Sequence, residues 1–441
     1  MTKIEKKNYQ MLLYDGFKIV LDERDPYELT YKGTTNMPIH RWVRLTPSFS
    51  PLLVSRLIKD FKCDRQSIVL DPFMGIGTTP LQCQFEGINS IGVDINPFLH
   101  YVATMKTSLW QKDLQKLSSG VQNFISRFLE QREKAKIPLD DFPKTLGIEL
   151  PKLHNYRRWW REDVLSDLLI AKHVIMSDFF EEDVRNFLKM GLVSILMDVA
   201  NVTYEGVQFT FIDRSGEKLD VFSSLQNRLG QMLQDVEYFQ QNVKLKGETS
   251  IILGDSTKIS ELIKKDRVTC VITSPPYPNR YSYVWNTRPY LYFFDFFSEP
   301  SEAAELDKKS IGGTWGKATS DLQKGRIAPV NSDLEEIVGE TVEKIRSKNK
   351  LKNTNLMANY VMKYFNMLYQ HIESLKEILV ENAKVAYVIG NSEIKGVEIP
   401  ADVWLGKILE IFDFSVDYII RARKRHSGKK LYEAIVIGTY R

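Results

Sequence analysis

Short apolar runs separated by turn signals begin near residue 67. The runs at residues 67–71 and 90–94 have the length of strands, and residues 78–86 have a helical pattern that ends at Gly87. A Pro-Phe pair and two glycines separate the first strand from this helix. Strand, glycine turn, helix and strand form a βαβ unit, which is typical of a parallel sheet covered by helices.

The hydrophobic period changes after Pro97. From about residue 98 to residue 242, apolar positions recur mostly with the spacing of a helix, which predicts a helical insertion. Residues 298–354 are irregular, with a glycine pair and a basic run, so we expect a loop with a helix inside. The other predicted elements are strands at 249–255, 268–273 and 384–390, helices at 360–381 and 401–412, and final strands at 416–421 and 431–439.

These elements predict an α/β fold. We expect a doubly wound, mostly parallel sheet with helices on both faces, an antiparallel hairpin at its edge and a helical insertion. The chain has no internal repeat and no low-complexity segment. One interrupted domain is therefore the simplest organisation.

The composition fits a soluble globular protein. Of the 441 residues, 43% are hydrophobic and 26% charged, and the formal net charge is +4. That small excess neither requires nor excludes a polyanionic partner. The first ten residues are polar and lysine-rich, and no stretch reaches the roughly 20 apolar residues that a membrane span needs. Because the three cysteines are also scattered, we expect a cytoplasmic protein without a membrane partner.

The turn after the first strand suits a ligand that approaches the backbone. Gly75 and Gly77 lie between strand and helix, and Asp94 ends the next strand roughly 20 residues later, where an acid can hold ribose hydroxyls. A dinucleotide site would need a third glycine where Pro80 stands. The turn therefore favours a nucleoside that carries an amino acid, whose carboxylate suits a helix start capped by threonines. The alternatives are a purely structural turn and an aspartate that only caps its strand.

A second turn combines two prolines with an aromatic residue. Residues 274–277 follow the apolar strand 268–273, so they lie at its carboxyl end, where α/β sheets bind ligands. The prolines fix the backbone, and their carbonyl oxygens together with the Ser274 hydroxyl offer acceptors for an amino group. Tyr277 adds a flat face for stacking of a base. Acceptors that pull on the hydrogens of an exocyclic amine free its lone pair to attack an electrophilic methyl group. A proline-rich structural turn is the alternative.

Together, the two turns resemble those of the amino-methyltransferases that modify DNA at adenine N6 or cytosine N4. The family's cofactor motif, Asp-Pro-Phe-x-Gly-x-Gly-Thr-Thr, matches residues 71–79 at every fixed position. Its catalytic motif, (Asp/Asn/Ser)-Pro-Pro-(Tyr/Phe), matches residues 274–277. The resemblance implies S-adenosylmethionine as cofactor and DNA as partner. A serine at the first catalytic position is typical of cytosine-N4 enzymes.

The resemblance also implies roles for single residues. Asp94 would bind the cofactor ribose, Asp255 would face the adenine ring, and the segment from Phe49 would close over the methionine end. The catalytic residues would be Ser274, Pro275, Pro276 and Tyr277. The residues expected to bind the cofactor are Phe49, Ser50, Asp71, Pro72, Phe73, Gly75, Gly77, Thr78, Thr79, Asp94, Asp255 and Thr273.

Arginines interleaved with aromatic residues follow the catalytic turn and suit a flipped base and its phosphates. We expect Asn279, Arg280 and Tyr283 to bind the substrate, with a buried helix start as the alternative. The basic turn at residues 423–430 is a candidate phosphate clamp, with solvated charge as the alternative. The six histidines show no ligand spacing and methyl transfer needs no metal, so no metal site is expected.

The prediction is a site-specific DNA methyltransferase that acts on cytosine N4 in a restriction-modification system, where a restriction endonuclease would be its companion. The alternatives are an adenine-N6 enzyme, an RNA base amino-methyltransferase and a cofactor-binding regulator without activity. The expected division is an N-terminal catalytic part with the cofactor motif (1–97), a helical insertion for target recognition (98–248), a catalytic-motif region (249–297), a mobile loop insertion (298–356) and a C-terminal catalytic part (357–441).

Overall fold

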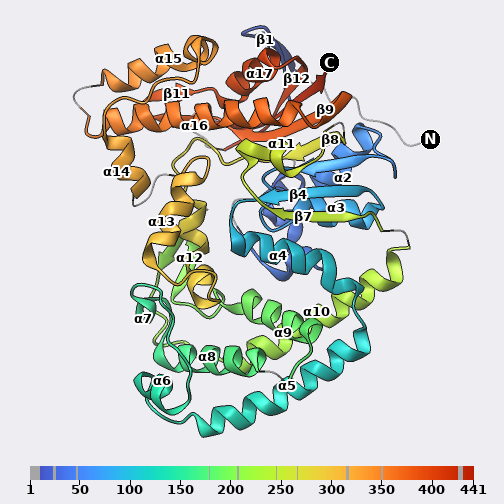
Figure 1. Ribbon diagram of the computed structural model, residues 1–441, viewed down its shortest axis with the longest axis vertical. Coiled ribbons are helices and arrows are strands. Elements are labelled where there is room, and N and C mark those ends of the chain that lie inside the picture. Colours follow the sequence, from blue (N-terminus) through green and yellow to red (C-terminus); the bar gives the residue numbers. More distant parts are fainter. Residues whose placement is uncertain are drawn as a thin grey trace.

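Nine strands form one large sheet in the order β1-β2-β12-β13-β9-β8-β3-β4-β7 (Figure 1). The computed structural model describes residues 10–22, 26–45, 48–177, 179–205, 208–244, 246–265, 267–313, 317–348, 351–425 and 431–441. The strands are β1 (Gln10–Tyr14), β2 (Phe17–Leu21), β3 (Ile68–Asp71), β4 (Asn89–Asp94), β7 (Thr249–Leu253), β8 (Val268–Thr273), β9 (Leu379–Gly390), β12 (Phe414–Lys424) and β13 (Tyr432–Tyr440). The five strands from β9 to β7 are all parallel, which confirms the predicted α/β fold.

The strands alternate their side chains between two hydrophobic cores, one on each face of the sheet. On β3, Val69 and Leu70 point to opposite cores, and on β8 Ile272 and Val271 do the same. One face is covered by α2 (Pro51–Asp60) and α3 (Thr78–Glu86), and the other by α15 (Ser332–Arg346), α16 (Thr354–Lys376) and α17 (Ala401–Ile411). The helices on both faces bury the apolar strands, as a parallel sheet requires.

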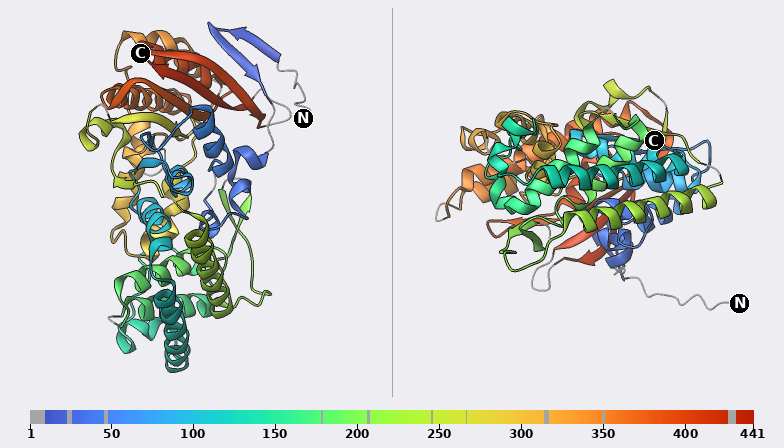
Figure 2. Two further views of the ribbon diagram at one scale, coloured as in Figure 1. Left: turned by 90° about the vertical axis from the view of Figure 1, so that its right-hand side faces the viewer. Right: turned by 90° about the horizontal axis from the view of Figure 1, so that it is seen from below.

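The antiparallel end of the sheet extends further than predicted. β13 runs antiparallel between β9 and β12, as expected for the predicted hairpin. Beyond it, β2 pairs in parallel with β12 and β1 forms the outermost strand (Figure 2). The β1–β2 turn consists of Asp15 and Gly16, both with positive φ angles of 51° and 87°. An Asp-Gly pair between apolar runs is a strong hairpin signal, so this hairpin could have been predicted.

A helical lobe lies on one side of the sheet, at the bottom of Figure 1. Its main helices are α4 (Pro97–Ser108), α5 (Leu114–Lys134), α8 (Glu162–Met176), α9 (Glu182–Ile195) and α10 (Val221–Asn242), with short helices α6 (Phe142–Thr145) and α7 (Tyr156–Trp159). They share one core, in which Trp159 and Trp160 are buried. The unpredicted hairpin of β5 (Val202–Glu205) and β6 (Gln208–Phe211) interrupts the helices.

The segment at residues 298–354, predicted as a loop with one helix inside, is more helical than expected. After α12 (Tyr283–Phe293) come α13 (Pro300–Lys309), α14 (Lys317–Gln323) and α15. The remaining short elements are α1 (Pro26–Leu29), α11 (Ile259–Leu262), β10 (Ser392–Ile394), β11 (Val397–Ile399) and 3-10 turns at Tyr31–Thr34, His40–Trp42, Leu109–Gln111, Leu139–Asp141 and Ser256–Lys258. None of the helices in the described ranges is long and apolar enough to cross a membrane.

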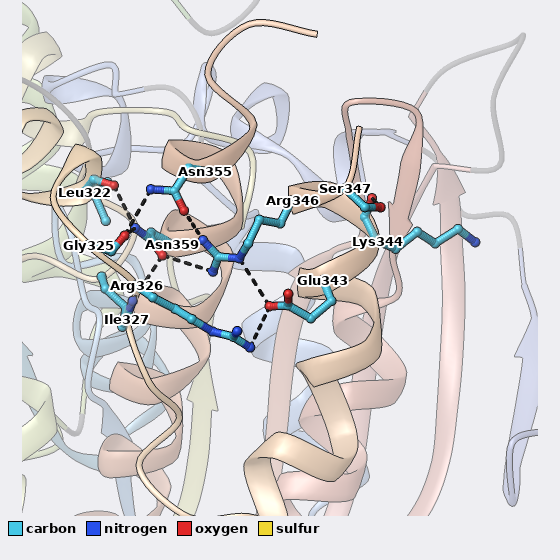
Figure 3. A network of polar contacts seen from close by, with 10 residues as sticks. All are labelled: Leu322, Gly325, Arg326, Ile327, Glu343, Lys344, Arg346, Ser347, Asn355 and Asn359. Carbon is cyan, nitrogen blue, oxygen red and sulfur yellow. Dashed lines mark hydrogen bonds and ion pairs between the residues drawn. The ribbon is translucent and has the colours of Figure 1, made fainter. Parts of the chain in front are cut away.

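A buried asparagine fixes the segment between α14 and α15 onto α16 (Figure 3). The Asn359 amide nitrogen donates to the carbonyl of Leu322 (2.9 Å), and its oxygen accepts from the amide of Ile327 (3.1 Å) and from Arg346 (3.2 Å). Arg346 in turn donates to Glu343 at 3.2 Å. Because Asn359 is fully buried and its amide is paired on both sides, this network specifies how the segment crosses α16.

A second buried group, Asp235 of α10, holds the segment at residues 39–42. Its carboxylate accepts hydrogen bonds from the Ile39 amide (3.0 Å), Arg41 Nε (3.1 Å) and Trp42 Nε1 (2.9 Å). Ile39 has a φ of 61°, which is strained for a β-branched residue. The three donors to one carboxylate keep this strained turn in place.

We expect Asp235→Ala to lower the free energy of unfolding by about 3–5 kcal/mol, because it leaves a partly buried arginine and two buried N–H donors without their acceptor. Denaturant unfolding followed by circular dichroism measures this. The exposed neighbour Glu237 gives the control: Glu237→Gln should change stability by less than about 0.5 kcal/mol. A loss below about 1 kcal/mol in Asp235→Ala would contradict the assigned role of the carboxylate.

Candidate active site

One pocket joins both predicted motifs at the carboxyl ends of β3, β4, β7 and β8. It has an empty volume of about 1090 Å³, open solvent at its mouth included. The predicted residues that line it are Phe49, Pro72, Phe73, Gly75, Thr78, Asp94, Asp255, Ser274, Pro276, Tyr277 and Tyr283. Because β3 and β8 are adjacent and parallel, with Val69 opposite Cys270, their two turns share this edge of the sheet.

The glycine turn leaves space for a ligand. Gly75 lines the pocket with a φ of 52°, and a Cβ at this position would meet no atom within 4 Å, so it would project into open space. Gly77 has a φ of 79° and lies against Ala103, whose Cβ would be 2.9 Å from an added Cβ. Gly75 therefore leaves room for a ligand, whereas Gly77 allows α3 to pack on α4.

Asp94 organises the backbone of the pocket floor. Its carboxylate accepts from the amides of Gly75 (3.0 Å) and Asn96 (2.8 Å). Burial raises the pKa of Asp94 to about 7. Both oxygens retain a free lone pair after these bonds, so the ionised carboxylate can still accept hydroxyl groups from a ligand.

Asp71 and Thr273 lie behind the pocket wall and not in it. The Thr273 hydroxyl donates to Asp71 Oδ1 at 2.6 Å, and the Phe73 amide donates to the same oxygen at 3.1 Å. The other carboxylate oxygen, Oδ2, is buried without a partner among the described residues, and burial raises the pKa of Asp71 to about 6. Thr79 is also behind the wall, where its hydroxyl donates to the Ile272 carbonyl at 3.3 Å. These residues connect the two motifs and do not line the pocket, and their expected contacts with the cofactor stay predictions.

Of the segment expected to close over the methionine end, Phe49 lines the pocket and Ser50 does not. The Ser50 hydroxyl is fully buried and accepts from the Leu52 amide at 3.2 Å, so it caps α2. The structure thus gives Ser50 a helix-capping role, and its expected contact with the cofactor stays a prediction. Ser48, which was not predicted, lines the pocket instead.

Residues far away in the sequence form hydrogen bonds with the catalytic turn, residues 274–277. The Ser274 hydroxyl donates to the Val388 carbonyl at 3.0 Å, and the Tyr364 hydroxyl donates to the Pro276 carbonyl at 2.6 Å. The Pro276 carbonyl, one of the acceptors expected for an amino group, therefore already accepts one hydrogen bond and keeps a second lone pair. Within the described ranges no group donates to the carbonyl of Pro275.

Tyr277 is less accessible than its predicted stacking role implied. Its side chain is 7% exposed, and its hydroxyl donates to Glu433 at 2.8 Å. Arg425 lies over the ring, 5.2 Å from its centroid. Tyr277 lines the pocket, so a base can contact it there, although little of its side chain is exposed.

The predicted substrate residues separate into two groups. Tyr283 lines the pocket and packs edge-on against Tyr281, with ring centroids 4.8 Å apart. Asn279 and Arg280 are exposed and do not line it. Arg280 has a φ of 61°, which is strained for a residue with a side chain. Its backbone amide donates to the Tyr360 hydroxyl at 2.9 Å, and this bond holds the strained backbone in place.

Several lining residues had no role in the sequence-based prediction. They are Leu45, Ser48, Met74, Ile76, Ile95, Asn96, Leu99, Gly254, Ser256, Val284, Lys309, Ser310, Ile311 and Glu433. Asn96 precedes a proline and caps α4, a local signal that could have been used. Of the predicted basic turn, residues 426–430 lie outside the described residues. The described part of the chain contains no group of three or more His, Cys, Asp or Glu side chains that could hold a metal ion.

Comparison with known proteins agrees with this geometry. A family model described as DNA methylase, of the N6/N4 type, matches residues 27–105. Type II methyltransferase M.BsoBI of Geobacillus stearothermophilus is 25% identical over 97% of this chain and 88% of its own length. Residues 27–105 therefore match the DNA methylase family of the N6/N4 type, and the chain is similar over nearly its whole length to a Type II methyltransferase.

Two further relatives of this DNA methyltransferase differ in how much they share. M.MvaI of Kocuria varians is 21% identical over 83% of the chain and 80% of its own length. M.MjaII of Methanocaldococcus jannaschii is 36% identical, but over only 26% of the chain and 21% of its own length. Enzymes of this family take the methyl group from S-adenosylmethionine. The open space at Gly75, the acceptor Asp94 and the start of α3 at Thr78 fit a nucleoside that carries an amino acid.

We expect Tyr364→Phe to slow methyl transfer to DNA by roughly threefold to tenfold, because the catalytic turn loses a fixed point. The measurement is the initial rate of labelled methyl incorporation into unmethylated DNA at saturating cofactor. Tyr369→Phe is the matched control, since Tyr369 lies on the same helix and its hydroxyl accepts from Asn331 outside the pocket. Equal rates for the two variants would contradict the role of Tyr364.

Proposed function

We propose that this enzyme is a site-specific DNA methyltransferase that transfers a methyl group from S-adenosylmethionine to N4 of cytosine. The observation that carries the proposal is the single pocket lined by Gly75 and Asp94 on one side and by Ser274 and Tyr277 on the other. A methyl donor held at the first pair then lies beside an amine held at the second. Proximity of this kind removes much of the entropic cost of a reaction between two substrates.

The cofactor side of the pocket would be held by Asp94, Asp255 and the start of α3. Ionised Asp94 would accept the ribose hydroxyls, and the N-terminus of α3 at Thr78 would hold the carboxylate. Asp255 caps the turn that follows β7, with its carboxylate accepting from the Thr257 amide at 2.9 Å, and would face the adenine ring. When bound, S-adenosylmethionine supplies an electrophilic methyl group on a sulfonium sulfur.

The amine side offers two acceptors. Ser274 Oγ keeps its lone pairs because its own proton is donated to Val388, and the Pro275 carbonyl receives no hydrogen bond within the described ranges. Both would accept from the hydrogens of an exocyclic amine, which shifts its nitrogen toward a tetrahedral geometry and frees the lone pair. The proton can leave to solvent after the transfer, so the turn needs no strong base.

The target base has to leave the DNA duplex to reach this pocket, because stacking hides its amino group. Flipping costs a few kcal/mol, which contacts in the pocket offset. The exposed Arg280 would contact a phosphate next to the flipped nucleotide. We assign the reading of DNA sequence to the helical lobe at 98–248 and to the segment at 298–356.

The choice of cytosine over adenine is supported by Ser274, since serine at this position is typical of cytosine-N4 enzymes. The three relatives named above are all called Type II methyltransferases, which supports a role in restriction-modification. A companion restriction endonuclease would be the functional partner of the enzyme in such a system.

Mass spectrometry of nucleosides from DNA treated with enzyme and cofactor tests the target. We expect N4-methylcytosine, and Ser274→Ala to lower its rate of formation by about 10- to 1000-fold, as for loss of one transition-state hydrogen-bonding group. The control is Ser260→Ala, which alters a serine away from the pocket that hydrogen-bonds Ser374. N6-methyladenine without N4-methylcytosine would replace the proposed target with adenine.

The raised pKa of Asp94 predicts a pH dependence of cofactor binding. Protonated Asp94 cannot accept two hydroxyls, so affinity for S-adenosylmethionine should rise from about pH 5.5 to about pH 7.5 as the carboxylate ionises. Without cofactor the sign is opposite: because the pKa of Asp94 is raised from 3.8 to about 7, its contribution to stability is lost as pH rises from about 4 to about 7.

Isothermal titration with S-adenosylmethionine at several pH values measures the effect. Asp94→Asn should bind more weakly and lose most of the pH dependence, with a small remainder from Asp71 near pH 6. A flat affinity for the unmodified enzyme between these pH values would contradict the assignment of Asp94 to the ribose.

A further inference from the structure

The three cysteines of the chain, which are scattered in the sequence, meet at one hydrophobic core. Cys83 on α3 and Cys270 on β8 are buried in this core, and Cys63, in the turn between α2 and β3, packs against it half-buried. All three are free thiols. The Sγ atoms of Cys63 and Cys270 are 3.2 Å apart and share a hydrogen bond, although the two residues are 207 positions apart in the chain. The fold therefore brings two distant thiols into direct contact.

The backbone holds the two sulfur atoms differently. Cys270 lies within the sheet, opposite Val69 of β3 and Lys384 of β9, so the parallel ladder fixes it on both sides. Cys63 follows the end of α2, where its amide donates to the Ile58 carbonyl at 2.9 Å, and the residues on both sides of it are exposed. A disulfide bond is about 2.05 Å long, so the sulfur atoms have to approach by roughly 1 Å. The turn at Cys63 can supply this movement, whereas the sheet cannot.

Packing alone does not require two thiols at this place. The surrounding side chains are apolar, and two small aliphatic residues would fill the same space. A buried cysteine packs like a small hydrophobic residue, and what distinguishes it is its reactivity. The contact between Cys63 and Cys270 adds one reaction that two aliphatic residues lack, which is oxidation to a disulfide.

We propose that Cys63 and Cys270 form a modification site at which a hydroperoxide produces a reversible disulfide, and that this bond fastens the end of α2 to β8. A hydroperoxide is the oxidant of choice because it is small enough to reach a half-buried sulfur atom. The inference goes beyond the proposed function and does not depend on it, since the bond forms whether or not the chain methylates DNA.

The reaction proceeds in two balanced steps. Hydrogen peroxide transfers one oxygen to Cys63 Sγ, which becomes a sulfenic acid, and the other oxygen leaves as water. Cys270 then loses its proton and attacks the Cys63 sulfur, so that the S–S bond forms and the S–O bond breaks. The hydroxide that leaves takes up the proton as a second water. Two thiols are thus oxidised while one peroxide is reduced, and an added thiol reverses the change.

The hydrogen bond between the thiols supports this order of steps. With Cys63 as the donor, it lowers the pKa of the Cys270 thiol and raises the pKa of the Cys63 thiol. The thiolate is the attacking form, so Cys270 suits the second step. Cys63 stays protonated, which makes the first step slow, and the site therefore responds to sustained exposure to peroxide.

The test is a count of free thiols in the full-length protein after treatment with hydrogen peroxide, removal of the peroxide with catalase and unfolding in guanidinium. We expect the count to fall from three to one and a reducing agent to restore it to three. Trypsin should release peptide 63–65 joined to peptide 268–280, lighter by two hydrogens than the separate peptides. The midpoint of thermal unfolding should rise by about 2–6 °C on oxidation, because the bond closes a long loop.

Three variants and an unfolded sample serve as controls. Cys83→Ala should still form the disulfide, whereas Cys63→Ala and Cys270→Ala should give no joined peptide and no rise of the unfolding midpoint. Cys63→Ala, in the half-buried turn, carries the comparison if Cys270→Ala does not fold. In protein unfolded before oxidation, Cys63 should pair mainly with Cys83, because the chain between them is much shorter.

The proposal is overturned if three free thiols remain after oxidation, or if Cys63 is recovered as a sulfinic acid beside a free Cys270. It is also overturned if the disulfide of the folded protein includes Cys83 or joins two protein molecules. A joined peptide without any rise of the unfolding midpoint would contradict the fastening of α2 to β8. None of these measurements uses methyl transfer, so a failure of the proposed function would leave their outcome unchanged.

Discussion

The hydrogen bond between Thr273 and Asp71 is the contact on which the rest of the site depends. It joins the last residue of β8 to the last residue of β3 at 2.6 Å, in a fully buried position, and so links the catalytic turn to the glycine turn. Parallel pairing of these strands brings the two turns to one edge, and this bond sets their spacing. A buried carboxylate is costly without partners, and the bond offsets that cost where the two motifs meet.

The local elements could be predicted from the sequence because their signals are local. Each of the parallel strands has an apolar run, and the glycine turn and the Pro-Pro-Tyr turn stand directly after two of them. The β1–β2 hairpin carries an equally local signal in Asp15 and Gly16. The segment at 298–354 is different, because its helices depend on burial against α16 through Asn359, which no local pattern contains.

The candidate site divides in the same way, into residues with a local sequence signal and residues without one. Motif residues such as Gly75, Asp94 and Ser274 line one pocket, as their position at strand ends implied. Residues that reach the pocket from other elements carry no signal of their own: Lys309 to Ile311 come from the end of α13, and Glu433 comes from the start of β13. Ser50 precedes a proline and caps α2, the same local signal that Asn96 carries before α4, so its capping role could have been predicted.

The hydroxyl groups around the catalytic turn show why its surroundings matter as much as the motif. Tyr364 donates to the Pro276 carbonyl, Tyr277 donates to Glu433, and Ser274 donates to the Val388 carbonyl. Each of these protons has a fixed destination, and each destination belongs to a different part of the fold. In the proposed reaction, the lone pairs of Ser274, which lines the pocket, would accept the target amine. A turn with the same four residues but without these partners would offer the amine several competing donors, so acceptor geometry for the reaction comes from the whole sheet and from α16.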